Sequence, residues 1–143
     1  MFIGEYQHSL DSKGRLAVPA KFRNDLKDGL VVTRGLDGCL FVYTADTWSE
    51  LAKKLATMSF TQKDKRAFNR SMFSGAMDFK LDAQGRIVLP EVLRNFAELD
   101  KEVVVIGVYD RLELWDKKTW EVYRSNMERT SNEVAERLGE IEI

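Results

Sequence analysis

The sequence predicts an α+β fold, mainly β, in which two copies of one unit interlock into a small β-barrel with helices appended. Three observations predict it: the chain contains an internal repeat, each copy consists of short apolar strands joined by turns, and each copy ends in an amphipathic helix. The chain has 143 residues, of which 44% are hydrophobic and 31% charged. Such a composition can bury a real core and excludes a disordered or low-complexity chain.

The internal repeat is the most informative feature. Residues 8–24 align with residues 79–95, and residues 36–48 align with 108–120 after one extra residue in the second copy. Two copies are too few for a solenoid, which needs about three repeats or more. We therefore expect a pseudo-twofold fold in which each half completes the other. The first alignment matches Asp11, Gly14, Arg15, Pro19, Arg23 and Asn24 with Asp82, Gly85, Arg86, Pro90, Arg94 and Asn95.

Each copy predicts the same order of strands and turns. A first strand enters an Asp-x-x-Gly-Arg turn, where Gly14 or Gly85 allows the positive φ of a tight hairpin. A second strand (16–18; 87–89) then stops at Pro19 or Pro90, which favours the first position of a short helix. An apolar strand (30–33; 103–106), a hairpin (36–38; 109–111) and a last strand follow. In copy two, Leu112 and Leu114 alternate with Arg111 and Glu113.

Each copy then continues into a helix. The Thr47-x-x-Glu50 spacing predicts a capping box. A second linker helix is expected from Thr61, with Phe68 and Met72 facing inward. The organisation is therefore a first module at 5–47, a helical linker at 48–76, a second module at 77–119, and a C-terminal helix with an acidic tail at 120–143. Apolar stripes interpreted as core are Trp48, Leu51, Ala52 and Leu55 in the first exit helix, and Trp120, Tyr123, Met127, Val134 and Leu138 in the last.

Residue usage narrows the possible chemistry. Cys39 and His8 are the only cysteine and histidine, so the sequence excludes an internal disulfide and a Cys/His zinc site, and no metal or other cofactor is predicted. Little remains for nucleophilic catalysis, and a chain that is not an enzyme is expected. The first ten residues, MFIGEYQHSL, do not have the basic and long apolar regions of a signal peptide, and no run of 18 apolar residues occurs. We therefore expect a cytoplasmic protein without a membrane partner.

Charge is distributed unevenly along the chain. The overall net charge is −1, but residues 1–90 carry +4 and residues 91–143 carry −5. Residues 53–70 are strongly basic, with six Lys or Arg against Asp64. This asymmetry suggests one face meant for an anion and another kept away from it. An ordinary solvated helix surface is the alternative explanation.

The repeated turns are the candidate binding elements. Arg15 or Arg86, projecting from a rigid glycine turn, could reach a phosphate or the O6/N7 edge of guanine. The Asp four residues earlier (Asp11; Asp82) could accept a hydrogen bond from that arginine and fix its conformation. Alternatively, Asp caps the turn and Arg closes a surface ion pair of small energetic value. Both interpretations remain open from the residues alone.

Residues around the turns add to this hypothesis. Lys13 in the first turn stands where Gln84 stands in the second, so the first turn is expected to attract phosphate more strongly. Arg23 and Arg94, one turn into the short helices, could add phosphate contacts. The matched aromatics Tyr43 and Trp115 are interpreted as paired core residues, and Cys39 as a packing residue.

These residues also carry a resemblance. The opening MFIGEY, both Asp-x-x-Gly-Arg turns, Glu113-Leu-Trp115 and Trp120 resemble the MraZ family of bacterial transcriptional regulators, within the AbrB/SpoVT/MazE superfamily. The resemblance covers essentially the whole chain. It implies a swapped-hairpin, double-psi-like barrel with two SpoVT-AbrB-type modules, and no small-molecule substrate. It also implies a nucleoid-associated, ring-shaped homo-oligomer that binds promoter DNA with repeated G-rich boxes upstream of division and cell-wall genes. The DNA-binding residues it implies are Arg15, Arg86 and Lys13, with Asp11, Asp82, Gly14, Gly85 and Gln84 flanking them.

Two other functions are alternative hypotheses. Antitoxins of the same superfamily pair a barrel with a tail that wraps a toxin, so a toxin-neutralising or scaffolding role is the second hypothesis. The third is a paired-Asp hydrolase in which Asp11 and Asp82 share a proton. The sequence opposes it, because neither Asp lies in an Asp-Thr/Ser-Gly motif and an arginine accompanies each. His8 is assigned no role, and the acidic tail, with Glu128, Glu133, Glu136, Glu140 and Glu142, is expected to point away from DNA.

Overall fold

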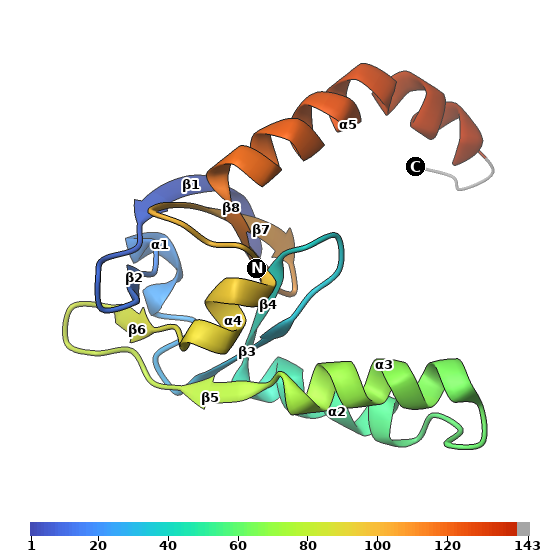
Figure 1. The fold of residues 1–143 in the computed structure, drawn as a ribbon, viewed down its shortest axis with the longest axis horizontal. Helices are drawn as coiled ribbons and strands as arrows, with labels where there is room; N and C mark the ends of the chain where they lie inside the picture. The colour runs from blue at the N-terminus through green and yellow to red at the C-terminus, as the bar shows by residue number, and fades with distance from the viewer. Residues whose placement is uncertain (140–143) are drawn as a thin grey trace.

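A six-stranded antiparallel sheet and a separate two-stranded sheet form the body of the molecule (Figure 1). The computed structural model describes residues 1–139. The larger sheet has the order β1-β7-β8-β4-β3-β5, and the smaller one pairs β2 with β6. The strands are β1 (Phe2–Ser9), β2 (Arg15–Ala17), β3 (Leu30–Arg34), β4 (Leu40–Thr44), β5 (Met77–Phe79), β6 (Arg86–Val88), β7 (Glu102–Tyr109) and β8 (Leu112–Asp116). The helices are α1 (Ala20–Arg23), α2 (Ala45–Ala56), α3 (Lys63–Ser74), α4 (Glu91–Phe96) and α5 (Lys117–Arg137).

The two repeats exchange strands. β1 of the first repeat pairs with β7 of the second, β5 of the second pairs with β3 of the first, and β4 pairs with β8 across the centre. The α+β fold of two mutually completing repeats is therefore confirmed. The expected closed barrel is not formed, because β1 and β5 remain the edges of the large sheet while β2 and β6 pair with each other outside it.

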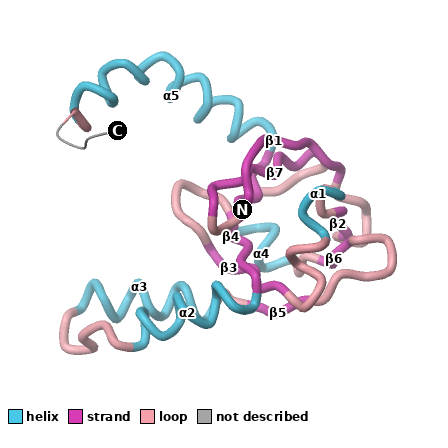
Figure 2. Tube along the Cα trace, turned by 180° about the vertical axis from the view of Figure 1, so that it is seen from behind, coloured by secondary structure: helices cyan, strands magenta, loops and turns pink. Residues whose placement is uncertain are grey.

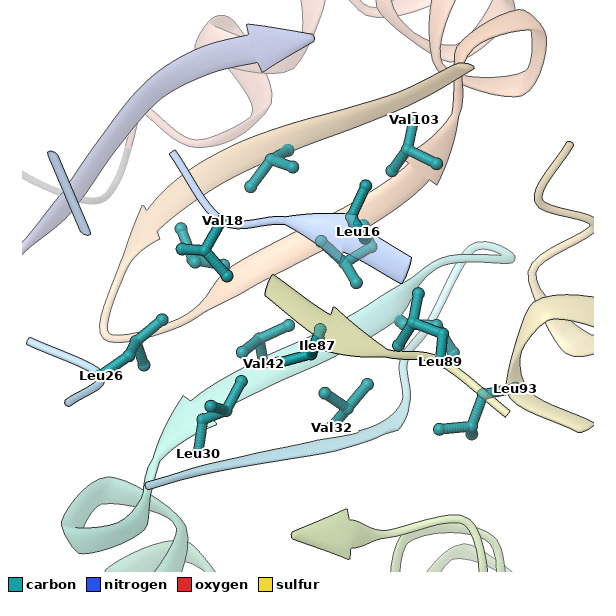
Figure 3. Close-up of a cluster of buried hydrophobic side chains, with 14 of the residues drawn as sticks. Leu16, Val18, Leu26, Leu30, Val32, Val42, Ile87, Leu89, Leu93 and Val103 are labelled. Carbon is teal, nitrogen blue, oxygen red and sulfur yellow. The ribbon is translucent and has the colours of Figure 1, made fainter. Parts of the chain in front are cut away.

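The main core lies between the two sheets. Leu16 of β2 and Ile87 of β6 are 1% and 3% exposed and point toward the large sheet (Figure 3). The large sheet contributes Val32 and Val42, which are also buried. Because each strand of the small sheet comes from a different repeat, this core cannot form from one repeat alone.

A second core covers the opposite face of the large sheet. Its two aromatic anchors are buried, Tyr43 on β4 and Trp115 on β8. Both are core residues as predicted, but the prediction that their rings pair with each other was wrong. Instead each contacts the tryptophan that opens the following helix, with ring centroids 6.0 Å apart for Tyr43–Trp48 and 5.2 Å for Trp115–Trp120. Cys39 is fully buried here, as a packing residue should be, and burial raises the pKa of its thiol to about 12.

Several predicted details of the strands and turns were wrong. The Asp-x-x-Gly-Arg turns form tight hairpins as predicted: the Asp11 N–H donates to the Arg15 carbonyl at 3.1 Å, and Leu10 and Leu16 form an antiparallel bridge. The hairpins stay short because β2 pairs with β6 of the other repeat. Both second strands start one residue earlier than predicted. Pro19 and Pro90 precede the short helices as N-caps rather than occupying their first turn.

The predicted capping box at Thr47 was also wrong. Helix α2 starts earlier, and its N-cap is Thr44, whose Oγ1 accepts a hydrogen bond from the Thr47 N–H at 3.1 Å. Glu50 is exposed on the helix surface instead of returning to the cap. The helix therefore begins about one turn earlier than predicted. Its free Thr47 N–H is still satisfied, because the Thr44 side chain accepts its hydrogen bond as a capping residue does.

The predicted alternation of β8 is present, and both of its faces are covered. Leu112 and Leu114 face the main core, whereas Glu113 lies on the opposite face beside Trp115 and is only 8% exposed. Its carboxylate accepts hydrogen bonds from the Arg111 guanidinium (3.0 and 3.1 Å) and the Trp115 indole N–H (3.2 Å). Arg111 in turn lies over the Phe41 ring, 4.5 Å from its centroid. A paired and hydrogen-bonded carboxylate can be buried where a free one cannot.

The long helices leave the body on the side away from the repeated turns (Figures 1 and 2). In α3, Met72 is buried as predicted, but Phe68 is 38% exposed. In α5 the predicted core stripe holds for Trp120 and in part for Tyr123, whose ring centroid lies 5.0 Å from that of Trp115. It is wrong beyond Tyr123, because the helix projects past the sheet. Tyr123, Met127, Val134 and Leu138 are all exposed by 41–46%. Glu140 and Glu142 lie outside the described residues, and none of the helices within residues 1–139 has the apolar run that a membrane span requires.

The core beneath α1 provides a test of this packing. Phe22 is 1% exposed and makes edge-to-face contacts with Phe2 (5.3 Å) and Tyr6 (5.4 Å). Phe22→Ala should lower the free energy of unfolding by about 3–5 kcal/mol, measured by urea denaturation, because it leaves a cavity. Phe60→Ala, at a side chain 79% exposed, is the matched control and should change stability by no more than about 0.5 kcal/mol. Equal effects of the two variants would contradict this description of the core.

Candidate nucleic-acid interface

The first repeated turn is built around the carboxylate of Asp11. Its Oδ1 accepts hydrogen bonds from the backbone N–H groups of Lys13 (2.9 Å) and Arg15 (2.8 Å), and its Oδ2 accepts one from Arg15 Nε (2.6 Å). The Gly14 N–H closes the turn on the Asp11 carbonyl at 3.0 Å, with Gly14 at φ +78°. A single carboxylate therefore caps the turn and holds the arginine side chain.

The second turn repeats this geometry. Asp82 Oδ1 accepts from the N–H groups of Gln84 (2.9 Å) and Arg86 (2.8 Å), and Oδ2 accepts from Arg86 Nε (2.9 Å). Gly85 lies at φ +75°, again a conformation that favours glycine. The two interpretations of the sequence, a capped turn and an oriented arginine, are thus both realised by the same atoms.

The arginines remain available for a ligand. Within residues 1–139, the side-chain hydrogen bonds of Arg15 and Arg86 to protein are made by Nε. The arginine side chains keep 34% and 30% of their surface exposed. Such exposed ion pairs contribute little stability. Their consequence is geometric, because each guanidinium is held at Nε while its two terminal nitrogens stay free to donate in a bidentate fashion.

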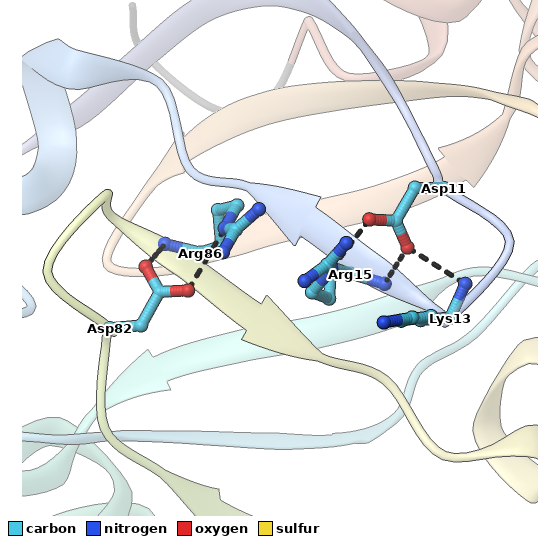
Figure 4. A network of polar contacts seen from close by, with 5 residues as sticks. All are labelled: Asp11, Lys13, Arg15, Asp82 and Arg86. Atoms are coloured by element: carbon cyan, nitrogen blue, oxygen red, sulfur yellow. Dashed lines mark hydrogen bonds and ion pairs between the residues drawn. The ribbon is translucent and has the colours of Figure 1, made fainter.

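Pairing of β2 with β6 brings the two arginines onto one surface. Arg15 pairs with Val88, and Arg86 with Ala17, so the arginines are diagonal neighbours, roughly 7–8 Å apart at the backbone. Since Leu16 and Ile87 face the core, their neighbours along each strand face outward. Figure 4 shows both guanidinium groups between the two turns, with each Asp on the outer side of its own arginine. Arg15, Arg86, Ala17 and Val88 form this surface, which we call the arginine ribbon.

The remaining predicted site residues are placed as follows. Lys13 and Gln84 are exposed at the tips of the two turns, and Gly14 and Gly85 are buried beneath them. Ala17 and Val88 were missed by sequence reasoning, although the period-two spacing Arg15–Ala17 and Arg86–Val88 could have indicated them. The basic residues 53–70, in α2, α3 and their connection, lie at the opposite end of the molecule from the two repeated turns (Figure 1). These basic residues and the arginine ribbon therefore do not form one patch.

Arg23 and Arg94 are each anchored on the body of the molecule through Nε. Arg23 Nε donates to the Val18 carbonyl at 2.9 Å, and Arg94 Nε donates to the Leu89 carbonyl at 3.0 Å. Both side chains are half-buried against the body rather than extended into solvent. The sequence did not predict these two hydrogen bonds, because the residue types do not show that each arginine turns back onto the carbonyl five residues earlier.

Hydrogen bonding keeps both aspartates ionised. The Arg15 backbone N–H, followed by the Arg15 side chain, lowers the pKa of Asp11, and the Arg86 backbone N–H acts first in lowering that of Asp82. A shared proton needs one of two carboxyls to have a raised pKa. His8 also has a lowered pKa, from burial and then from the Arg23 charge.

Comparison with known proteins identifies the family. The family model described as "MraZ protein, putative antitoxin-like" matches the chain twice, at residues 1–71 and 72–140. The chain belongs to the MraZ family. It is 51% identical over 138 residues, 96% of this chain and 97% of the relative, to a protein of Desulforamulus reducens named Transcriptional regulator MraZ. The two MraZ matches fall on the two halves that exchange strands, so the family of transcriptional regulators and the repeat are both shown.

The Asp11 contacts generate a titration test. Arg15→Gln should raise the pKa of Asp11, because it removes the guanidinium, but not fully to the ordinary value, because the backbone N–H groups of residues 13 and 15 still donate. Carboxyl-carbon NMR across an acid titration measures it, with Asp82 as the internal control.

The sign for stability follows from the same shift. The folded-state pKa of Asp11 lies below its unfolded value, so its stabilising contribution is complete above the unfolded pKa and is lost as pH falls through the folded pKa. In Arg15→Gln the folded-state pKa of Asp11 moves closer to its unfolded value, so this carboxylate stabilises the fold by less. An unchanged Asp11 titration in the variant would show that the guanidinium does not act on the carboxylate in solution.

Proposed function

We propose that this MraZ-family chain is a sequence-specific DNA-binding regulator that acts through the arginine ribbon. The observation that carries the proposal is the pair of outward arginines on β2 and β6, each held at Nε by its own aspartate. The proposed target is promoter DNA with repeated G-rich boxes, upstream of division and cell-wall genes. The proposed location is the nucleoid, in the cytoplasm.

The chemistry of guanine fits the free ends of these arginines. Guanine presents O6 and N7 acceptors in the major groove, which also admits a two-stranded β-ribbon. Two terminal N–H₂ groups in one plane match those two acceptors, and the Asp that holds Nε limits the conformational entropy lost on binding. Lys13, exposed at the tip of its turn, is proposed to contact a neighbouring phosphate, and Gln84 to donate a neutral hydrogen bond.

Several copies are needed for useful affinity. One bidentate arginine gives roughly 1–3 kcal/mol of base discrimination. We propose a ring-shaped homo-oligomer in which repeated ribbons engage repeated DNA boxes, since linked weak sites gain avidity when their spacing matches. The net charge of −1 supports this scheme, because it gives a single copy little non-specific attraction to DNA. The exposed apolar side chains of α5 leave surface for contact with a neighbouring copy.

The division into modules at 5–47 and 77–119, with helices at 48–76 and 120–143, is proposed as the working organisation of this assembly. We propose no catalytic role. A paired-Asp hydrolase would need the two carboxylates to face each other, whereas an arginine lies on the inner side of each (Figure 4).

Removal of one ribbon arginine tests the proposal directly. Arg15→Ala and Arg86→Ala should each weaken binding to DNA from upstream of its own gene by at least roughly 5- to 150-fold, because each deletes a bidentate base contact from every copy that engages the DNA. Fluorescence anisotropy at one fixed salt concentration measures the affinity, and light scattering checks the oligomer. Arg129→Ala, on the exposed part of α5, is the control and should bind as wild type. Equal binding by all four proteins would overturn the proposal.

The difference between the two turns gives a second test. Lys13→Gln should lower the slope of log affinity against log salt by about 0.9 for each phosphate that Lys13 neutralises. The reciprocal Gln84→Lys should steepen it, because it places an ammonium at the matching position of the other turn. If neither exchange changes the slope, the turns do not differ in phosphate contact.

A further inference from the structure

The two recognition turns are each held by residues of the other repeat. The Val18 N–H, at the end of β2, donates to the Gly85 carbonyl of the second turn at 2.9 Å. Symmetrically, the Leu89 N–H, at the end of β6, donates to the Gly14 carbonyl of the first turn at 2.8 Å. Each turn is therefore tied to the strand that the opposite repeat contributes.

An arginine completes each of these ties. Arg23 Nε donates to the Val18 carbonyl and Arg94 Nε to the Leu89 carbonyl, so the residue that holds each turn is itself held on its other side. Pro19 and Pro90 follow directly and fix the backbone φ at this point.

The same arginines also lie against the glycines of the turns. A Cβ built on Gly85 would lie 2.5 Å from Arg23 Cδ and 2.7 Å from Cζ. A Cβ on Gly14 would lie 2.9 Å from the Leu89 carbonyl and 3.2 Å from Arg94 Nε. The positive φ favours glycine at both positions, and a side chain there would also displace Arg23 at Gly85 or meet the Leu89 carbonyl at Gly14.

We propose that Arg23 and Arg94 are positioning residues for DNA recognition, each fixing the turn of the opposite repeat: Arg94 the turn 11–15, and Arg23 the turn 82–86. This rests on the proposed function in that the turns present the DNA-binding arginines. The hydrogen bonds from Arg23 to Val18 and from Arg94 to Leu89 do not themselves depend on any ligand. This positioning role is an alternative to the phosphate contacts that the sequence suggested for Arg23 and Arg94.

The crossed connection has a specific signature in the free protein. In Arg94→Lys, amide hydrogen exchange should accelerate at Leu89 and in the turn 11–15, while the turn 82–86 of the same repeat stays protected. In Arg23→Lys, it should accelerate at Val18 and in the turn 82–86. Lysine keeps the charge but lacks the Nε–H and the planar group that covers the glycine. Faster exchange confined to the turn of the mutated repeat, or no change in either turn, would overturn the proposal.

DNA binding separates positioning from phosphate contact. If Arg94 fixes the first turn, Arg94→Lys should weaken binding several-fold, with the salt slope unchanged, because the number of phosphates neutralised stays the same. A phosphate-binding Arg94 would instead tolerate lysine, and Arg94→Gln would lower the slope by about 0.9 for each phosphate it neutralised. Arg129→Lys is the matched control. Wild-type binding by Arg94→Lys would overturn the positioning role.

Titration of the aspartates gives a readout that does not depend on DNA. Loosening of the first turn in Arg94→Lys should raise the pKa of Asp11 toward its ordinary value and leave that of Asp82 unchanged. Arg23→Lys should have the reverse effect. Because both are measured without DNA, a failure of the proposed function leaves this test intact, and a failure here leaves Arg15 and Arg86 as recognition residues.

Discussion

Pairing of β2 with β6 is the constraint on which the rest of the structure depends. Each of these three-residue strands leaves its own repeat and finds its hydrogen-bonding partner in the other. Their inward residues, Leu16 and Ile87, complete the core, and their outward residues form the arginine ribbon. The same six residues therefore contribute both to the core that joins the repeats and to the surface proposed to bind DNA.

The turns illustrate how one carboxylate can serve structure and recognition together. Asp11 satisfies two backbone donors and one side-chain donor at distances of 2.6–2.9 Å. The exposed ion pair itself is a weak source of stability. Its importance is that the arginine reaches solvent in one orientation, with the conformational entropy of its inner end already given up in the folded state.

Sequence reasoning was most successful where the repeat gave two independent copies of a pattern. The order of strands, the turns with positive φ, and the exchange between halves all followed from aligned residues such as Gly14 and Gly85. It failed where the outcome depended on contacts between distant segments. The pairing of β2 with β6 has no local signal. The burial of Glu113 depends on Arg111, which itself lies over Phe41 of the other repeat. The stripe of α5 has the correct helical spacing but loses its cover beyond Tyr123, whose ring still packs on Trp115.

Covalent linkage of two unequal turns gives the molecule a direction. A dimer of identical single-repeat chains presents its twofold axis to a duplex and reads it alike from either end, so its best target is a palindrome. Here the pseudo-twofold axis passes between β2 and β6, and the position of Lys13 in the first turn is occupied by Gln84 in the second. The two turns therefore differ in chemistry. Because one chain carries both, they do not dissociate from each other on dilution. Under the proposed function, a chain with two unlike turns would favour tandem DNA sites that all run in the same direction.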